Sequence, residues 1–288
     1  MLVALIGASG QLGTDLQKII PTRSLIKLDY PDFDITKKNI VESGLSSFKP
    51  DIVINTAAYN LVDRAEDYPE EAMAVNFYGV THLSASCLKL NIPLVHYSTD
   101  YVFGADSKRN HPYTEEDIPG PINQYGRSKL KAEQFITQKM KQYFIIRTAY
   151  LFGTAGSKAK GGNIIESMIN IGRQQGELRA ATNQFINPTY TLDLAKQTLN
   201  IIQTQHYGLF HAVSRGNCTP YKLATEIFNC LGKKINIIPV KADYFKPKAG
   251  RPLYSVLENK KLNQLKINIM PSWPQSLRHY LKEKKYIN

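Results

Sequence analysis

A glycine-rich loop lies between an apolar run and an amphipathic segment at the start of the chain. The apolar run Leu2–Ile6 leads into Gly7, Gly10 and Gly13, and a helical pattern follows. In a strand–loop–helix unit, the first glycine permits a tight turn, the second lets the backbone approach a pyrophosphate, and the third lets the helix pack closely on the strand. The N–H groups of the first helical turn then face the phosphates. This context predicts a dinucleotide-binding site.

An acidic residue stands where such a site needs one. Asp29 ends the second apolar run, 19 residues after Gly10. A carboxylate at this place accepts hydrogen bonds from the adenosine ribose and disfavours a 2′-phosphate, which favours NAD. Arg23 and Lys27 are close enough in sequence to leave NADP as an alternative, so we expect NADPH or NADH. Without a dinucleotide, Asp29 reads as an ordinary turn residue.

Short apolar runs alternate with longer amphipathic stretches through residues 1–150. Strands are expected at Leu2–Ile6, Leu25–Leu28, Asp51–Asn55, Pro93–Ser98 and Phe144–Arg147. Helices are expected near Gly13–Ile20, Lys38–Phe48, Tyr68–Leu90 and Asn123–Lys141. Runs rich in Val, Ile and Leu are typical of strands buried on both faces of a parallel sheet. The alternation predicts an α/β fold, with a Rossmann-like doubly wound parallel sheet between two layers of helices.

The second half of the chain is less regular. Its expected elements are strands at Leu178–Ala181, Gly208–Val213 and Ile235–Val240, helices at Thr191–Ile202 and Thr219–Leu231, and further helices at the C-terminus. We assign residues 1–150, with about 178–213, to the dinucleotide-binding domain. The remainder, about 151–177 with 214–288, is expected to form a smaller α/β substrate domain over the edge of the sheet.

Tyr125 and Lys129 are spaced one helical turn apart and should project from the same helix face. An ammonium about 6 Å from a phenol, at an effective dielectric constant of about 20, favours the phenolate by roughly 3 kcal/mol. We therefore expect Lys129 to lower the pKa of Tyr125 into a range useful for acid–base chemistry. Thr99 ends an earlier strand, and strand ends in a parallel sheet open on the ligand crevice. The alternative roles are surface packing for Tyr125 and Lys129 and a turn cap for Thr99.

The excess of positive charge lies in the second half of the chain. The whole sequence has a net charge of +12, whereas residues 1–150 contain 16 basic and 17 acidic side chains and residues 151–288 contain 20 and 7. Such a half suits nucleic acid, a membrane surface, a phosphorylated ligand or simply a solvated surface. No apolar run approaches the roughly 18 residues of a membrane span, and no nucleic-acid-binding motif is present. We expect neither partner.

Cysteine and histidine usage argues against a metal centre. Cys87, Cys218 and Cys230 form no CxxC pair, and no two histidines are four residues apart. We expect no bound metal and a reduced, cytoplasmic protein. The N-terminus runs directly into the glycine motif without a basic segment, so we expect no signal peptide.

Ordered motifs along nearly the whole chain resemble those of the dTDP-4-dehydrorhamnose reductase family, within the extended short-chain dehydrogenase/reductase superfamily. The matching segments are Gly7–Gly13, Asn55–Tyr59, Val62–Glu66, Ser98–Phe103, Pro121–Lys129, Arg147–Thr148, Asn187–Thr189 and Arg251–Pro252. That family makes dTDP-L-rhamnose for bacterial surface polysaccharides. The resemblance implies a Rossmann-like fold, NADPH or NADH as cofactor and a dTDP-sugar as substrate.

The resemblance also implies roles for individual residues. Thr99, Tyr125 and Lys129 would be the catalytic trio. The cofactor, besides contacting Tyr125 and Lys129, would be bound by Gly7, Gly10, Gln11, Leu12, Gly13, Asp29, Asp34, Ile35, Ala57, Ala58 and Tyr59. The substrate would be bound by Val62, Arg64, Thr99, Tyr101, Tyr150 and Arg251. Independently of the family, the paired donors of an arginine such as Arg251 suit a pyrophosphate, the alternative being a surface ion pair.

Three positions depart from the family pattern, and all lie on the sugar side. Arg147–Tyr150 reads Arg-Thr-Ala-Tyr where the family usually has Arg-Thr-Ser-Trp. Asn183–Thr189 carries Asn and Ile in place of the usual Asp and Gly, and Thr154–Gly162 is an additional stretch. Reduction of a nucleotide-linked 4-ketosugar is therefore a firmer expectation than rhamnose itself.

The leading hypothesis is a reductase that transfers hydride from NAD(P)H to C4 of a dTDP-4-keto-6-deoxyhexose, first of all dTDP-4-dehydro-L-rhamnose. One alternative is a related nucleotide-sugar 4-ketoreductase acting on a different deoxyhexose. Another is a non-catalytic regulatory subunit, which the resemblance to the methionine adenosyltransferase β subunit suggests. A homodimer is one expected assembly.

Overall fold

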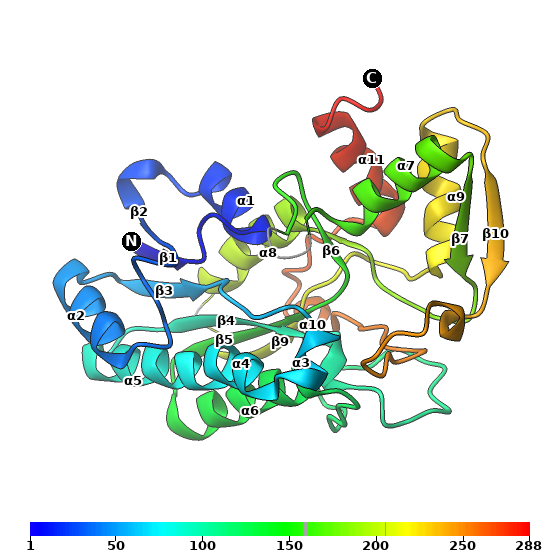
Figure 1. Ribbon diagram of the computed structural model, residues 1–288. Helices are drawn as coiled ribbons and strands as arrows, with labels where there is room; N and C mark the ends of the chain where they lie inside the picture. The colour runs from blue at the N-terminus through cyan, green and yellow to red at the C-terminus, as the bar shows by residue number, and fades with distance from the viewer. Residues whose placement is uncertain (158–160, 205) are drawn as a thin grey trace.

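The computed structural model describes residues 1–157, 161–204 and 206–288, and its centre is a parallel six-stranded sheet (Figure 1). The strand order is β2-β1-β3-β4-β5-β9, every neighbouring pair being parallel. The strands are β1 (Val3–Ile6), β2 (Leu25–Leu28), β3 (Ile52–Asn55), β4 (Leu94–Thr99), β5 (Tyr143–Thr148) and β9 (Gly208–His211). This is the predicted doubly wound sheet.

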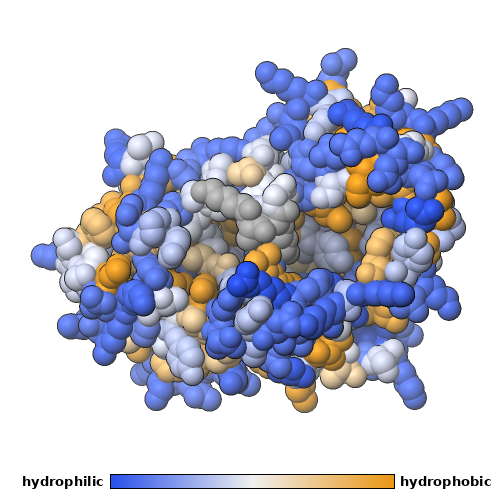
Figure 2. All heavy atoms as spheres, viewed as in Figure 1, coloured by the Kyte–Doolittle hydropathy of each residue, from blue (hydrophilic) through white to orange (hydrophobic). Residues whose placement is uncertain are grey.

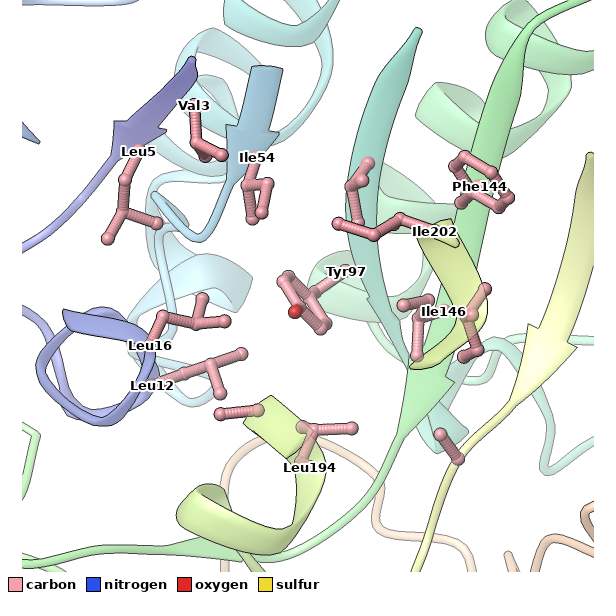
Figure 3. Close-up of a cluster of buried hydrophobic side chains, with 14 of the residues drawn as sticks. Val3, Leu5, Leu12, Leu16, Ile54, Tyr97, Phe144, Ile146, Leu194 and Ile202 are labelled. Carbon is pink, nitrogen blue, oxygen red and sulfur yellow. The ribbon is translucent and has the colours of Figure 1, made fainter. Parts of the chain in front are cut away.

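Helices cover both faces of the sheet because alternate strand residues point to opposite sides. On one face, Val3, Leu5 and Tyr97 pack against α1 (Gln11–Ile19) and α8 (Thr191–Ile202), as Figure 3 shows. On the other face, Ala4 and Ile6 belong to a core shared with α2 (Lys38–Phe48), α5 (Val80–Leu90) and α6 (Gln124–Lys139). These helices do not cover the carboxyl ends of the strands, so a ligand can reach that end of the sheet.

A core separate from those on the two faces of the sheet, the second core, lies beside the carboxyl ends of the strands (Figure 1). Its elements are α7 (Ile164–Gln175), β7 (Glu177–Ala181), α9 (Pro220–Cys230), β10 (Asn236–Val240) and α11 (Trp273–Glu283). β7 and β10 pair in parallel as a separate two-stranded sheet. A short pair, β6 (Leu151–Phe152) with β8 (Thr189–Tyr190), joins the two parts. The surface is hollowed between them (Figure 2).

The remaining elements are short. They are α3 (Arg64–Asp67), α4 (Pro69–Met73), α10 (Lys260–Gln264), the 3-10 turns η1 (Thr22–Ser24), η3 (Asp100–Val102) and η5 (Ala242–Phe245), and the π-helical stretch η2 (Ala74–Gly79). Within the described residues, no helix has both the length and the apolar character needed to cross a membrane.

Two expected elements form with details that the sequence pattern did not specify. The helix expected over Tyr68–Leu90 forms as α4, η2 and α5 in succession, and it is π-helical in the middle, where the Asn76 side chain binds the backbone of Tyr59 and the hydroxyl of Ser128. The strand expected at Leu178–Ala181 forms as β7 and pairs with β10 in a sheet separate from the central one. Its apolar residues pack on α7 and α9, so the second core retains it.

Candidate active site

A cavity of about 1190 Å³ opens at the carboxyl ends of β1, β3 and β4. The chain runs from β1 to β2 on one side and returns to β3 on the other, so this is the point where the strand order reverses. Ligands of open α/β sheets bind at such a point. Of the residues expected to form the site, those that line the cavity are Gly7, Gly10, Gln11, Leu12, Asp29, Asp34, Ile35, Ala57, Ala58, Val62, Arg64, Thr99, Tyr101, Tyr125, Lys129, Tyr150 and Arg251.

Two expected residues, Gly13 and Tyr59, lie behind the cavity wall. A Cβ on Gly13 would stand 2.3 Å from the carbonyl oxygen of Gly7, so its absence lets α1 pack on the loop. The Tyr59 hydroxyl donates to Glu71 at 2.9 Å, and its N–H donates to the Asn76 side chain. Both residues therefore hold the framework of the site.

The glycine loop has the features that a pyrophosphate requires. Gly7 has a φ of +73°, which only glycine adopts without strain, and Gly10 is the N-cap of α1 without a side-chain hydrogen bond. The first N–H groups of α1 are thus uncapped by a side chain. Gln11 Oε1 is buried at the same place and has no hydrogen-bond partner among the described residues. The uncapped N–H groups fit the phosphates of a dinucleotide, and Gln11 Oε1, which can only accept, fits a hydroxyl donor of the same ligand.

Asp29 is bound to the glycine loop itself. Its carboxylate accepts from the N–H of Ser9 at 3.0 Å and from the Ser9 hydroxyl at 2.9 Å. This fixes the carboxylate at the end of β2 on the cavity wall. The position fits the adenosine ribose end of a dinucleotide whose phosphates lie on the loop.

Thr99, the last residue of β4, and Tyr125, in the first turn of α6, line the same cavity. Thr99 Oγ1 accepts from the Tyr101 N–H at 3.2 Å and donates to Asp100 Oδ1 at 3.1 Å, while Ser255 Oγ donates to Asp100 Oδ2 at 2.5 Å. Tyr125 is the second residue of α6, which Asn123 caps by accepting from the Gly126 N–H at 2.7 Å. The cap fixes the first turn of α6 and with it the direction of Tyr125.

The acid–base properties of these groups differ from the expected ones. Burial raises the pKa of Tyr125 to about 12, and a hydrogen bond with Thr99 acts in the opposite direction. Burial lowers the pKa of Lys129 to about 8, against the attraction of Glu133. Burial also raises the pKa of Asp100 to about 6. The expected lowering of the Tyr125 pKa is wrong, because loss of water outweighs any stabilisation of the phenolate.

Sequence reasoning missed a pair of buried residues behind Lys129. Its Nζ lies 3.3 Å from His96 Nε2, and His96 Nδ1 lies 3.2 Å from the amide nitrogen of Asn55. The paired register of β3 and β4 sets Asn55 beside His96. The only signal for His96 in the sequence is a polar residue within an otherwise apolar run that is typical of a buried strand.

The side of the cavity facing the second core carries polar and aromatic groups. Arg251 Nη2 donates to Asp63 Oδ2 at 2.7 Å, while its Nη1 is buried without a partner in the described part of the chain. Tyr150 has a φ of +44°, a conformation that non-glycine residues adopt at a cost. Arg64 lines the cavity but is tied to Glu71 at 2.7 Å. Arg251 therefore has a buried donor available for a ligand.

The described residues contain no group of three His, Cys, Asp or Glu side chains arranged to hold a metal ion.

Comparison with known proteins gives matches over the whole chain. The family model for the RmlD substrate binding domain matches residues 1–286. A spore coat polysaccharide biosynthesis protein of Bacillus subtilis, SpsK, is 34% identical over 98% of this chain and 97% of its own length.

Solved structures show the same relationship. A dTDP-4-dehydrorhamnose reductase from Clostridium acetobutylicum is 36% identical and superimposes with a TM-score of 0.93. The match covers 99% of this chain and 100% of that chain. One from Bacillus anthracis in complex with NADP is 34% identical with a TM-score of 0.93, covering 98% of this chain and 100% of its own.

Proposed function

The chain belongs to the dTDP-4-dehydrorhamnose reductase family, and we propose that it reduces the C4 keto group of a dTDP-4-keto-6-deoxyhexose with NADPH or NADH. The observation that carries this proposal is that Thr99, Tyr125 and Lys129 line the same cavity as the glycine loop. The substrate that the family name suggests first is dTDP-4-dehydro-L-rhamnose.

The dinucleotide fits the β1–β3 side of the cavity. The uncapped start of α1 would bind the pyrophosphate, Gln11 would lie beside it, and Asp29 would bind the adenosine ribose. Asp34 and Ile35 would line the adenine pocket, with Ala57 and Ala58 along the backbone of the cofactor. When bound, the dihydronicotinamide supplies the hydride.

Tyr125 would provide the proton for the reaction. As hydride reaches C4, negative charge develops on O4 of the sugar, and a neutral phenol beside it donates its proton. Burial serves this role, since a pKa of about 12 keeps Tyr125 protonated at neutral pH. Lys129, with a pKa of about 8, holds a proton at Nζ that replaces the one Tyr125 gives up. Thr99 would orient the carbonyl oxygen.

The substrate would occupy the side of the cavity toward the second core. The free Nη1 of Arg251 fits the diphosphate of the sugar nucleotide. Val62, Tyr101 and Tyr150 line the same cavity. The family pattern that this sequence resembles has tryptophan at the position of Tyr150, so a different deoxyhexose is the second candidate substrate.

The two ligands are proposed to bind to different parts of the chain, one part built on the central sheet and the other on the second core. Residues 1–150, with α8 and β9, would bind the dinucleotide, and the part built on α7, β7, α9, β10 and α11 would bind the sugar nucleotide. The cysteines are all free in the structure, which supports a cytoplasmic protein. The homodimer, and the absence of a nucleic-acid partner, stay predictions that light scattering and a gel shift would test.

Turnover assays test the proposal directly. The loss of NADPH absorbance is measured with dTDP-4-dehydro-L-rhamnose and with other dTDP-4-keto-6-deoxyhexoses, for wild type, Tyr125→Phe and the surface control Tyr78→Phe. We expect Tyr125→Phe to lower kcat by about 10²–10⁴-fold, the usual contribution of a general acid, with Tyr78→Phe unchanged. Equal turnover in wild type and Tyr125→Phe would contradict the assigned acid. A wild type inactive on every ketosugar would favour a regulatory subunit.

A further inference from the structure

His96 is a buried, titratable side chain to which the proposed reaction gives no role. It lies in the middle of β4 and is 1% exposed, in a strand that is buried throughout. Only two side chains contribute polar atoms to its ring nitrogens in the described part of the chain, Asn55 on β3 and Lys129 on α6. A buried imidazole between these two must have one defined protonation state.

The backbone fixes which way the Asn55 amide points. Asn55 Oδ1 accepts from the N–H of Ala57 at 3.1 Å, and a backbone N–H can only donate. The amide nitrogen therefore faces His96 Nδ1, at 3.2 Å, and it too can only donate. His96 Nδ1 must accept this bond, so it carries no proton.

The tautomer of His96 follows from that hydrogen bond. Burial, followed by the charge of Lys129, holds the pKa of His96 well below its usual value, so the ring is neutral. A neutral imidazole without a proton on Nδ1 carries it on Nε2. The Nε2–H then faces Lys129 Nζ across 3.3 Å. An ammonium has no lone pair to accept this bond, whereas an amine has one.

We propose that His96 is a positioning residue for Lys129, and that the Asn55–His96 pair stabilises the amine form of Nζ by presenting an N–H donor to it. This inference deepens the proposed function, and its consequence for turnover rests on that function. After Tyr125 gives its proton to O4, Lys129 protonates the phenolate and becomes an amine, which accepts from His96. A proton from water in the cavity then restores the ammonium, so each cycle consumes one hydride and one solvent proton.

The other charged groups around Lys129 act against the amine or are engaged elsewhere. Glu133, one turn further along α6, favours the ammonium, but Arg147 of β5 binds its carboxylate at 2.7 Å. Asp100 of η3 is hydrogen-bonded by Thr99 and Ser255. On the other elements packed against α6, Glu66 of α3 binds the Gln124 N–H, Glu71 of α4 binds Arg64 and Tyr59, and His82 of α5 binds the Ile35 carbonyl. His96 is thus the side chain in direct contact with Nζ.

The tautomer is tested in the unmodified protein, whether or not it is active. A long-range proton–nitrogen spectrum of 15N-histidine-labelled protein is expected to show His96 protonated on Nε2 and bare on Nδ1. Its signal is assigned by its loss in His96→Gln. A proton on Nδ1 would overturn the inference, and this measurement does not depend on any variant's turnover.

The effect on Lys129 is tested by titration. The 13Cε signal of Lys129, assigned through Lys129→Met, is followed against pH in wild type, His96→Gln, Asn55→Asp and the exposed control His279→Gln. Gln at position 96 can present an acceptor to Nζ, and Asp at position 55 would move the imidazole proton to Nδ1. We expect both to raise the pKa of Lys129 by about one unit or more, with His279→Gln unchanged. An unchanged or lower pKa in both variants would overturn the inference.

Kinetics separate this inference from the proposed function. In an active reductase, the alkaline limb of kcat in His96→Gln should move to higher pH with the Lys129 titration, while KM for NADPH stays constant. A change confined to KM would contradict a role acting through Lys129. A wild type without reductase activity but with the expected His96 and Lys129 signals would contradict the proposed function alone.

Discussion

Arg251 and Asp63 form an ion pair between the Lys246–Pro252 loop and the segment that precedes α3, with 2.7 Å between Nη2 and Oδ2. The other oxygen of Asp63 accepts from the Ala249 N–H at 2.9 Å. The guanidinium also lies over the Tyr101 ring, 5.9 Å from its centroid. One edge of Arg251 is thus held by protein while Nη1 is left to bind a ligand.

Removing the charge of Asp63 should weaken sugar-nucleotide binding more than catalysis. Asp63→Asn leaves Arg251 less firmly oriented, and since both side chains are partly exposed we expect a loss of about 1 kcal/mol, or about fivefold in KM for the sugar nucleotide. kcat and KM for NADPH should change little. Asp67→Asn, which breaks the neighbouring ion pair with Lys248, is the matched control. Equal KM values in the two variants would refute the special role of Asp63.

Asp100 carries a stability cost that depends on pH. Its folded pKa of about 6 lies above the ordinary 3.8 because burial disfavours the charged carboxylate. Between these values the folded state binds more protons than the unfolded chain, so stability falls as pH rises from about 4 to 6 and stays lower above it. The difference between the two pKa values corresponds to about 3 kcal/mol.

Asp100→Asn should therefore stabilise the protein near pH 7.5 by about 1–3 kcal/mol relative to its effect at pH 4. Urea unfolding of wild type and variant at both pH values measures this difference, and Asp51→Asn on the surface is the control. Turnover should fall in the same variant, because the carboxylate beside Thr99 is lost. A variant that is destabilised more at pH 7.5 than at pH 4 would contradict a raised pKa for Asp100.

Local sequence patterns predict one part of the site, whereas the other part depends on contacts between segments far apart in the sequence. The roles of Gly7 and Gly13 follow from a loop of seven residues, and Tyr125 and Lys129 share a face through helix periodicity alone. The contact of Asn55 with His96 depends on the register of two strands 41 residues apart, and that of Asp63 with Arg251 spans 188 residues. The pKa of Tyr125 differs from the expectation because the spacing of Tyr125 and Lys129 indicates a nearby ammonium but not the burial of the phenol. The sequence of β7 predicts a strand but does not specify that its partner is β10.

Two glycines of the loop should respond differently to alanine. A Cβ at Gly13 would meet the carbonyl oxygens of Gly7 and Ala8 at 2.3 and 2.5 Å, and backbone atoms cannot rotate away. At Gly10 the nearest atom would be the Gly7 oxygen at 3.2 Å. We expect Gly13→Ala to cost about 1–3 kcal/mol in urea unfolding and most of the NADPH affinity. Gly10→Ala should be milder in unfolding. The reverse order would contradict the packing role of Gly13.

The carboxylate of Asp29 should set the choice between NADH and NADPH. Ser9 holds it at the end of β2 through three contacts of 2.9–3.0 Å, where the ribose of the dinucleotide is proposed to lie. A 2′-phosphate close to this charge is repelled, yet the Bacillus anthracis relative was solved with NADP. Asp29→Ala should therefore raise the ratio of kcat/KM for NADPH over NADH about tenfold, since about 1.4 kcal/mol of repulsion is removed.

The control for this change is Asp32→Ala, which removes the same charge three residues away. Asp32 is exposed and does not line the cavity, so its loss alters the general field without touching the ribose site. If both variants raised the NADPH preference equally, long-range electrostatics would explain the result and Asp29 would have no specific role. A ratio that rises only in Asp29→Ala locates the discrimination at the carboxylate that Ser9 holds. Because direct contacts are screened less than distant charges, the difference between Asp29→Ala and wild type should persist at high salt.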